Sequence, residues 1–322
     1  MNKNAKIYIA GHRGLVGGAI VRMLQTEGYT NLLFRTHAEL DLLDQAAVNN
    51  FFEKEKPEYV FLAAAKVGGI GANSTYPADF IYQNTMIGFN VVHAAYKNNV
   101  KKLINLGSSC IYPKLAPQPM KEEYLLSDFL EQTNEAYAIA KINVIKLCSF
   151  YNRQYGTNYL SVMPTNLYGP GDNYDPNGSH VLPALIRKFH EAKVSGSDKV
   201  VLWGDGSPRR EFLFSGDLAD ALVMLMQKKD AKDLSNPAGD FVNIGSGKDL
   251  TIKELAEKIR GIVYEGISDR TCRIEWDSSK PNGTPQKLLD ISKITALGFL
   301  PKIVLSKGIE LAYKDYMHNY KE

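Results

Sequence analysis

The sequence predicts an α/β protein with a doubly wound, parallel sheet and a smaller C-terminal α/β domain. Short apolar runs typical of strands alternate with helical patterns through the first half of the chain. A glycine-rich turn joins the first of these strands to the first helix. After Gly169 the sequence becomes rich in glycine, asparagine, aspartate and proline. Alternating strands and helices favour a parallel sheet, because each crossover helix packs on one of its faces.

Composition sets the broad class of the protein. With 322 residues, 44% apolar and 23% charged, the chain is typical of a globular protein with a large core. The net charge of +3 shows no excess of basic residues that would favour binding to nucleic acid or to an anionic membrane surface. No apolar run approaches the roughly 20 residues needed to span a membrane. Three cysteines and an N-terminus without a signal-peptide core favour a reducing, cytoplasmic location. We predict no metal site.

The first strand, residues 6–10, runs directly into a loop with glycines at Gly11, Gly14 and Gly17, and a helical pattern follows. In this context Gly11 permits a tight turn, Gly14 allows a pyrophosphate to approach, and Gly17 lets the helix lie close to the strand. The loop therefore predicts a Rossmann-type dinucleotide site. Its spacing, G-x-x-G-x-x-G, is not the more familiar G-x-G-x-x-G, and a plain strand–helix turn remains the alternative.

The remaining elements divide the chain into two parts. We expect strands at residues 32–34, 59–62, 102–106 and 159–163, and helices at 44–56, 77–98 and 133–150. Residues 1–168 form the predicted cofactor domain, to which roughly 211–240 return with an apolar-faced helix at 217–227. Residues 169–210 and 241–322 form the predicted substrate domain.

Arg35 follows the second strand, where cofactor choice is normally decided. A carboxylate there would bind a ribose 2′-hydroxyl and select NAD, whereas a cation accommodates the 2′-phosphate of NADP. No acid occurs before Glu39 and Asp41. The pattern favours NADP, with a solvated surface arginine as the alternative.

Three residues predict a reductase centre. Ser108 follows the apolar run 102–106, at the strand end where ligands bind in open α/β sheets. Tyr137 and Lys141 lie four residues apart on a helical pattern and so share one face. A neighbouring lysine favours ionisation of a tyrosine, which normally titrates at a pH of about 10. Together the three would hold a carbonyl and protonate the alkoxide formed by hydride transfer.

Cys110 and His180 supply a second kind of chemistry. A thiol and an imidazole can both move protons near neutral pH, and a ketone acidifies the carbons beside it. The site would thus epimerise next to a carbonyl and then reduce that carbonyl. Structural roles for both residues remain the alternative.

Several motifs resemble those of the GDP-4-keto-6-deoxy-D-mannose epimerase-reductases of the extended short-chain dehydrogenase/reductase family, over nearly the whole chain. They are GHRGLVG at 11–17, AAAKVGGI at 63–70, LGSSCIYPK at 106–114, YAIAK at 137–141, PTNLYGP at 164–170 and SHV at 179–181. The resemblance implies 3,5-epimerisation of GDP-4-keto-6-deoxy-D-mannose and NADPH-dependent reduction of its 4-ketone, giving GDP-L-fucose. It also implies a homodimer, paired through the helix that carries Tyr137.

The resemblance further implies a role for each site residue. Ser108, Tyr137 and Lys141 carry the reduction, and Cys110 is the base and His180 the acid of epimerisation. The implied NADPH contacts are Gly11, His12, Arg13, Gly14, Leu15, Val16, Gly17, Arg35, His37, Asp41, Leu42, Leu106, Gly107, Ser109, Pro164, Thr165, Asn166 and Leu167. The implied GDP-sugar contacts are Lys188, Trp203, Arg210 and Asn282, with Lys287 nearby.

Some positions depart from the family pattern. His37 and Lys188 stand where arginine is frequent, and Asn282 stands where aspartate is usual. The segment 213–217 also lacks the usual histidine-valine-aspartate run. These departures predict altered affinity rather than a different reaction. Two alternative functions remain. One is a nucleotide-sugar reductase or epimerase without double epimerisation, which would not need Cys110 and His180. The other is a non-catalytic NADP sensor, which would lack Tyr137 or Lys141.

Overall fold

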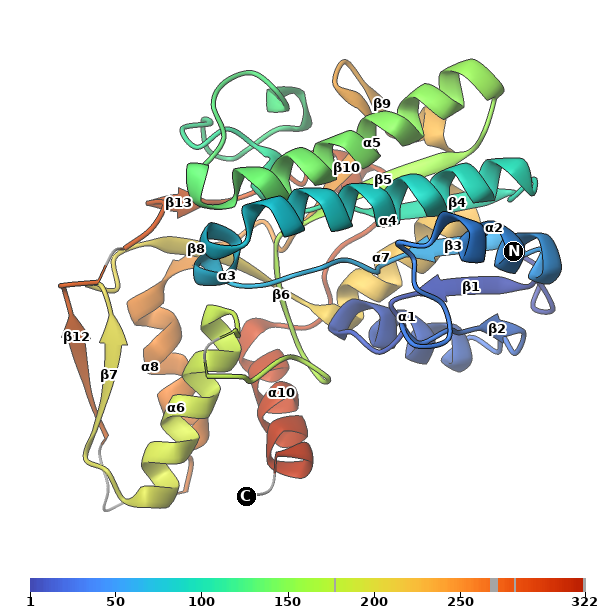
Figure 1. Ribbon diagram of the computed structural model, residues 1–322. Coiled ribbons are helices and arrows are strands. Elements are labelled where there is room, and N and C mark those ends of the chain that lie inside the picture. The colour runs from blue at the N-terminus through green and yellow to red at the C-terminus, as the bar shows by residue number, and fades with distance from the viewer. Residues whose placement is uncertain (177, 267–271, 281, 321–322) are drawn as a thin grey trace.

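The computed structural model describes residues 1–176, 178–266, 272–280 and 282–320, and its centre is a seven-stranded sheet (Figure 1). In spatial order the strands are β2 (Leu32–Leu33), β1 (Ile7–Ala10), β3 (Tyr59–Leu62), β4 (Lys102–Leu106), β5 (Tyr159–Pro164), β10 (Gly239–Ile244) and β9 (Ser235–Asn236). Neighbouring strands are parallel except for β9 and β10. The predicted doubly wound α/β fold is confirmed.

Helices cover both faces of this sheet. They are α1 (Leu15–Thr26), α2 (Gln45–Glu55), α4 (Pro77–Lys97), α5 (Glu135–Tyr155) and α7 (Ser215–Lys228). Along β1, Ile7 and Ile9 face a core shared with α1 and α7, whereas Tyr8 and Ala10 face a core shared with α2, α4 and α5. This alternation is the two-residue period of a strand buried on both faces.

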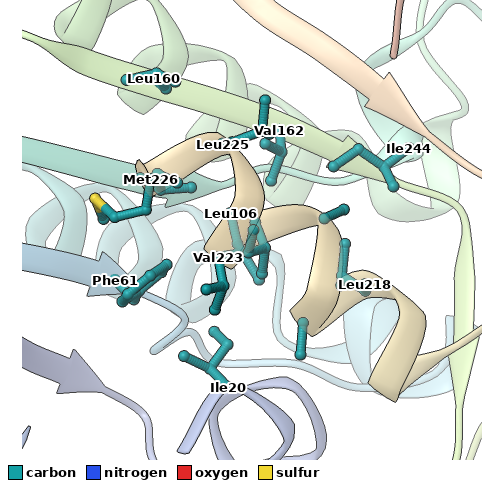
Figure 2. Packing of buried hydrophobic residues seen from close by; sticks show 14 of the residues in the cluster. Ile20, Phe61, Leu106, Leu160, Val162, Leu218, Val223, Leu225, Met226 and Ile244 are labelled. Carbon is teal, nitrogen blue, oxygen red and sulfur yellow. The ribbon is translucent and has the colours of Figure 1, made fainter. Parts of the chain in front are cut away.

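The core beneath α1 and α7 is almost entirely aliphatic. Figure 2 shows the side chains of α7 packed among residues of α1 and the sheet, with Ile20, Phe61, Leu106, Leu160, Val162, Leu218, Val223, Leu225, Met226 and Ile244 labelled. The helix predicted to return to the first part of the chain is thus α7. Its packing brings residues 215–228 back to the cofactor half of the molecule.

A second, smaller lobe lies beside the carboxyl ends of the central strands (Figure 1). Its sheets contain β6 (Asn166–Tyr168), β8 (Arg209–Phe214), β11 (Asp249–Thr251) and β13 (Gln286–Lys287), and separately β7 (Lys199–Trp203) with β12 (Arg273–Asp277). Its helices are α6 (Val181–Ser195), α8 (Ile252–Val263) and α10 (Leu305–Asn319), which share one apolar core. Two short helices, α3 (Ile70–Thr75) and α9 (Ser292–Ala296), complete the described α-helices, together with 3₁₀ turns at 109–111, 122–124, 132–134 and 231–234.

Helix boundaries follow from local chemistry. Asp44 caps α2 by accepting a hydrogen bond from the Ala47 N–H at 3.0 Å, and Thr251 and Glu254 form a capping box at the start of α8. Gly156, in a left-handed conformation, ends α5. No helix in the described part of the chain has the length and apolar character needed to cross a membrane.

The structure corrects the predicted division of the chain at three strands. Residues 166–168 and 211–214, predicted in the cofactor domain, form β6 and most of β8, which pair with each other in the second lobe. Residues 241–244, predicted in the substrate domain, lie in β10, which pairs with β5 as the sixth strand of the main sheet. Ile294 and Phe299, also assigned to the substrate domain, are buried in the core of the main sheet. A short apolar run carries no local signal for the sheet that it joins, and this explains the error.

Candidate active site

The glycine loop has the close-packed form that the sequence predicts. Gly11 has a φ of +85°, and a Cβ there would lie 2.7 Å from the Ala64 nitrogen. A Cβ on Gly17 would lie 2.0 Å from the Gly11 carbonyl oxygen, so neither position accepts a side chain. Gly14 begins α1 without a side-chain cap, which leaves first-turn N–H groups for a phosphate. The loop therefore fits the diphosphate of a dinucleotide.

The predicted 2′-phosphate region contains Arg35, which is bonded within the protein, and His37, which is exposed. Arg35 donates from Nη2 to Glu55 Oε1 at 2.7 Å and from Nη1 to the Phe34 carbonyl at 2.7 Å. His37, by contrast, is exposed, with its Nδ1 3.6 Å from Asp41 Oδ1. The ion pair with Glu55 weakens the case for Arg35 as a phosphate ligand, and this contact stays a prediction.

The other predicted cofactor residues of this region lie at the start of α1 and in the segment after β2. His12 packs against the Phe34 ring, with centroids 5.1 Å apart, and burial lowers the pKa of its imidazole. Arg13 is exposed beside it, whereas Leu15 and Val16 are partly buried in the first turn of α1. Leu42 is buried, and its carbonyl accepts a hydrogen bond from Asn90 Nδ2 at 2.9 Å.

The predicted reductase residues meet at the end of β4. Lys141 Nζ donates to the Leu106 carbonyl at 2.8 Å and lies 5.7 Å from the centroid of the Tyr137 ring. Ser108 begins the 3₁₀ turn that follows β4, and its Oγ accepts from the Cys110 N–H at 3.4 Å. A helix and a strand end thus bring together a hydroxyl, a phenol, an ammonium and a thiol, with Ser109 in the same turn.

Burial controls the ionisation of this group. It lowers the pKa of Lys141 to about 8 and raises the pKa of Tyr137 above its ordinary value. The sequence predicts that Lys141 favours the tyrosinate, but desolvation of the phenol outweighs that effect in the folded protein. Tyr137 is therefore a protonated phenol at neutral pH, which is the form that a proton donor needs.

Cys110 is coupled to both of these side chains. Burial raises the pKa of its thiol, while the Ser108 hydroxyl, Lys287 and Lys141 act in the opposite direction. A charge on Cys110 in turn raises the pKa of Tyr137 and of Lys141. The thiol therefore belongs to the same electrostatic site as the tyrosine and the lysine.

His180 occupies the N-cap position of α6, across from the glycine turn after β3. A Cβ on Gly69 would lie 4.0 Å from the carbonyl oxygen of the preceding residue, Ser179. The ring is exposed, yet the protein packed around it desolvates it and lowers its pKa, which favours neutral imidazole. Among the described residues no hydrogen bond joins His180 to Cys110.

The predicted cofactor residues after β5 connect the two lobes. Thr165 Oγ1 and Asn166 Nδ2 donate to the Glu211 carbonyl at 3.2 and 2.9 Å. Pro164 ends β5, and Leu167 continues into β6. Gly107 approaches β5 closely, because a Cβ there would lie 2.3 Å from the Met163 methyl carbon.

The predicted GDP-sugar residues lie along the second lobe. Arg210 and Lys287 are register partners in β8 and β13, and burial lowers the pKa of each. Lys188 Nζ donates to the Val201 carbonyl at 3.1 Å. Trp203 is 68% exposed at the end of β7, with Lys280 5.8 Å from its ring centroid. Asn282 Oδ1 accepts from the Asp205 N–H at 2.9 Å and so shapes the turn after β7.

The sequence reasoning missed three residues that shape the site. Phe80 packs edge-on against Tyr137, with centroids 6.3 Å apart. Asn84 holds the backbone of Lys66, accepting from its N–H at 2.9 Å and donating to its carbonyl at 3.0 Å. Glu211 is fully buried. Asn84 is an amide among the buried residues of α4, and a buried amide normally needs a hydrogen-bond partner. This pattern is the feature of the sequence that could have predicted its role.

Taken with the doubly wound sheet, the glycine loop and the serine–tyrosine–lysine group define a nucleotide-cofactor enzyme of the short-chain dehydrogenase/reductase class. The chain belongs to the NAD dependent epimerase/dehydratase family, whose pattern matches residues 7–245. In the described part of the chain no cluster of three potential metal ligands occurs.

Known relatives cover almost the entire chain. It is 57% identical to GDP-L-fucose synthase 1 of Arabidopsis thaliana, over 99% of this chain and 95% of that protein. It is 54% identical to GDP-L-fucose synthase of Escherichia coli K12, over 98% and 97%. The solved GDP-mannoheptose C4 reductase of Campylobacter jejuni, with NADP bound, is 44% identical with a TM-score of 0.89, over 98% and 99%.

Proposed function

We propose that this protein converts GDP-4-keto-6-deoxy-D-mannose into GDP-L-fucose by 3,5-epimerisation followed by reduction of the 4-ketone. The observation that carries the proposal is that Cys110 lies in the same turn as Ser108, at the end of β4, where Lys141 is bonded to the Leu106 carbonyl and lies 5.7 Å from the Tyr137 ring centroid. A proton-transfer thiol beside a reductase pair suits one site that performs both reactions. The GDP-L-fucose synthases that share more than half of this sequence support the choice of substrate.

In the reduction, bound NADPH supplies hydride to the ketone carbon. Ser108 Oγ and the Tyr137 hydroxyl hold the ketone oxygen, and Tyr137 donates its proton as the oxygen becomes an alkoxide. Lys141, fixed by the Leu106 carbonyl, stabilises the tyrosinate left behind. The buried setting strengthens each of these interactions, because the local dielectric constant is low.

In the epimerisation, the ketone makes the hydrogens on both neighbouring carbons acidic. Cys110 removes such a proton, and the electron pair moves onto the ketone oxygen as an enolate, which Ser108 and Tyr137 hold as they hold the alkoxide. His180, in its imidazolium form, returns a proton to the opposite face of the carbon and thereby becomes the neutral imidazole that its desolvated setting favours. Reduction then fixes the new configuration, since the product no longer has an acidifying carbonyl.

A second candidate is a C4 reductase of another GDP-sugar that does not epimerise. The similarity to the GDP-mannoheptose C4 reductase favours it. Such an enzyme needs Ser108, Tyr137 and Lys141 but makes no use of Cys110 as a base, so proton exchange distinguishes the two candidates.

The test is one reaction in heavy water with GDP-4-keto-6-deoxy-D-mannose and NADPH, followed by proton NMR of the product. We expect GDP-L-fucose with deuterium at both carbons flanking the former ketone. Oxidation of NADPH without that deuterium would support the simple reductase instead.

Two matched variants assign the two reactions. Cys110→Ser should retain NADPH binding and lose proton exchange by about 100-fold or more, the usual size of acid–base catalysis. Tyr137→Phe should lose hydride transfer by a similar factor. Normal exchange in Cys110→Ser would remove the thiol from the mechanism, and normal reduction in Tyr137→Phe would contradict the triad.

We also propose a homodimer that pairs through α4 and α5. These helices lie side by side on one face of the molecule (Figure 1), and their outer surface carries the exposed rings of Tyr82, Phe89, Phe150 and Tyr155. A cluster of exposed aromatic residues is typical of a protein–protein interface. The cytoplasmic location expected from the sequence remains a prediction.

A further inference from the structure

The chain crosses several times between the two lobes, and one buried carboxylate contacts segments of these crossings. The chain leaves the main sheet for the second lobe after β5 and again after β10, and it returns to the core of the main sheet after β13. Glu211, on β8 of the second lobe, is fully buried and forms hydrogen bonds with all three of these crossing segments. It therefore lies where the position of one lobe relative to the other is determined.

The carboxylate of Glu211 binds two of the crossing segments. Its Oε1 accepts from the Gly247 N–H at 2.7 Å, in the segment after β10, and its Oε2 accepts from the Leu289 N–H at 3.0 Å, two residues after Lys287. A Cβ on Gly245 would lie 2.2 Å from Oε1, so the segment after β10 packs directly against the carboxylate. Both oxygens thus accept from N–H donors, which a buried carboxylate needs in place of water.

The backbone of Glu211 binds the third crossing segment. Its carbonyl accepts from Thr165 Oγ1 at 3.2 Å and from Asn166 Nδ2 at 2.9 Å, and both of these residues are predicted to contact the cofactor. The Thr165 N–H donates to the Ile244 carbonyl at 3.0 Å, so the segments after β5 and β10 are also bonded to each other. Because these bonds do not involve the Glu211 side chain, a substitution at that side chain leaves their donors and acceptors in place.

The carboxylate contacts lie beside two cations of the second lobe. Arg210 precedes Glu211 on β8, and it is the register partner of Lys287 on β13. Both cations are partly buried, and Arg210 Nη1 donates to the Arg209 carbonyl at 2.8 Å. Two cations on neighbouring strands suit the diphosphate of a nucleotide sugar. The bond from the Leu289 N–H to Glu211 keeps the strand of Lys287 next to that of Arg210.

We propose that Glu211 is a positioning residue that holds Arg210 and Lys287 where they bind the diphosphate of the GDP-sugar. Its carboxylate binds the end of the Lys287 strand and the segment after β10, while its carbonyl binds the cofactor side of the site. The sugar is thereby kept at a fixed position relative to the cofactor. The use of the two cations rests on the proposed function, whereas the hydrogen bonds of Glu211 belong to the free protein.

The first test is Glu211→Gln, which keeps the size of the side chain but turns an amide NH₂ group toward one of the two N–H donors. We expect the dissociation constant of GDP, measured by calorimetry, to rise by about 10- to 100-fold, the usual effect of losing a hydrogen bond to a charged group. The dissociation constant of NADPH should stay near the wild-type value. Unchanged GDP binding, or equal losses for GDP and NADPH, would overturn the proposal. Circular dichroism checks that the variant folds.

Asp217→Ala is the matched control. Asp217 is another buried carboxylate that accepts from two backbone N–H groups, those of Lys302 and Ile303, at 3.1 and 2.9 Å. Its substitution destabilises the protein without removing a bond to the strands of Arg210 and Lys287, so GDP and NADPH should bind as they do to the wild type. A similar loss of GDP binding in this control would attribute the effect to general destabilisation and overturn the proposal.

The second test measures amide hydrogen exchange at Gly247 and Leu289 in the free protein. In Glu211→Gln we expect exchange at one or both amides to accelerate by about tenfold or more, because an N–H loses its acceptor, while the amides of β5 remain protected. Unchanged protection of both amides would overturn the proposal. If the wild-type protein does not bind GDP, the proposed function fails, while hydrogen exchange still decides whether the Glu211 carboxylate holds the two segments.

Discussion

Asp172 is a buried carboxyl group that the proposed chemistry does not use. It is 8% exposed, its Oδ1 accepts from the Asn173 N–H at 2.8 Å, and its Oδ2 has no hydrogen-bond partner within the described structure. Burial raises the pKa of this carboxyl from 3.8 to about 7. Between these two pH values the folded state holds a proton that the unfolded chain releases. The contribution of Asp172 to the free energy of unfolding is therefore fully present below pH 3.8 and is lost as the pH rises through about 7.

We predict that Asp172→Asn stabilises the protein at high pH. The amide keeps the acceptor for Asn173 and carries no charge, so the free energy of unfolding should rise by ~1–3 kcal/mol near pH 8 and change little near pH 4. Urea unfolding at the two pH values measures this. The exposed residue Asp198, replaced by Asn, serves as a control without that pH dependence. A loss of stability near pH 8 in Asp172→Asn would contradict the prediction.

At the scale of elements, α7 ties the end of the chain to the cofactor half. Near its start, the buried residue Asp217 accepts from the Lys302 and Ile303 N–H groups at 3.1 and 2.9 Å. Asp217→Ala leaves both donors without that acceptor, and we expect a loss of about 2–4 kcal/mol in unfolding free energy. Asp220→Ala removes a surface ion pair to Lys302 one turn away and should cost less than about 1 kcal/mol. Equal losses in urea unfolding of the two variants would contradict this account.

Periodicity predicted most of these elements because their patterns are local. The 3.6-residue spacing of α2 and the apolar run of β4 need no knowledge of the rest of the chain. The membership of β10 in the main sheet was missed because it depends on long-range pairing with β5. The Arg35–Glu55 pair was missed for the same reason, since α2 supplies the partner.

At the scale of the whole molecule, the site is built from segments that meet only in the folded chain. The end of β4 and the start of α5 carry Cys110 and Tyr137, whereas β8 and β13 of the second lobe carry Arg210 and Lys287. Sequence motifs predicted the first group, because a strand end and one helical turn fix its geometry. They did not predict the role of the buried Glu211, whose carboxylate accepts from the Leu289 N–H at 3.0 Å, because this contact joins residues far apart in the sequence.

The outer face of α4 and α5 gives a prediction for the assembly. Phe89 and Tyr155 are 37% and 45% exposed on these two helices. If the dimer forms there, Phe89→Asp with Tyr155→Asp places charges in its apolar centre and should shift the mass in sedimentation velocity from two chains to one. Leu300→Asp, at a 62% exposed apolar site away from both helices, should stay dimeric. A wild-type monomer, or a double variant that remains dimeric, would show that α4 and α5 do not form the interface.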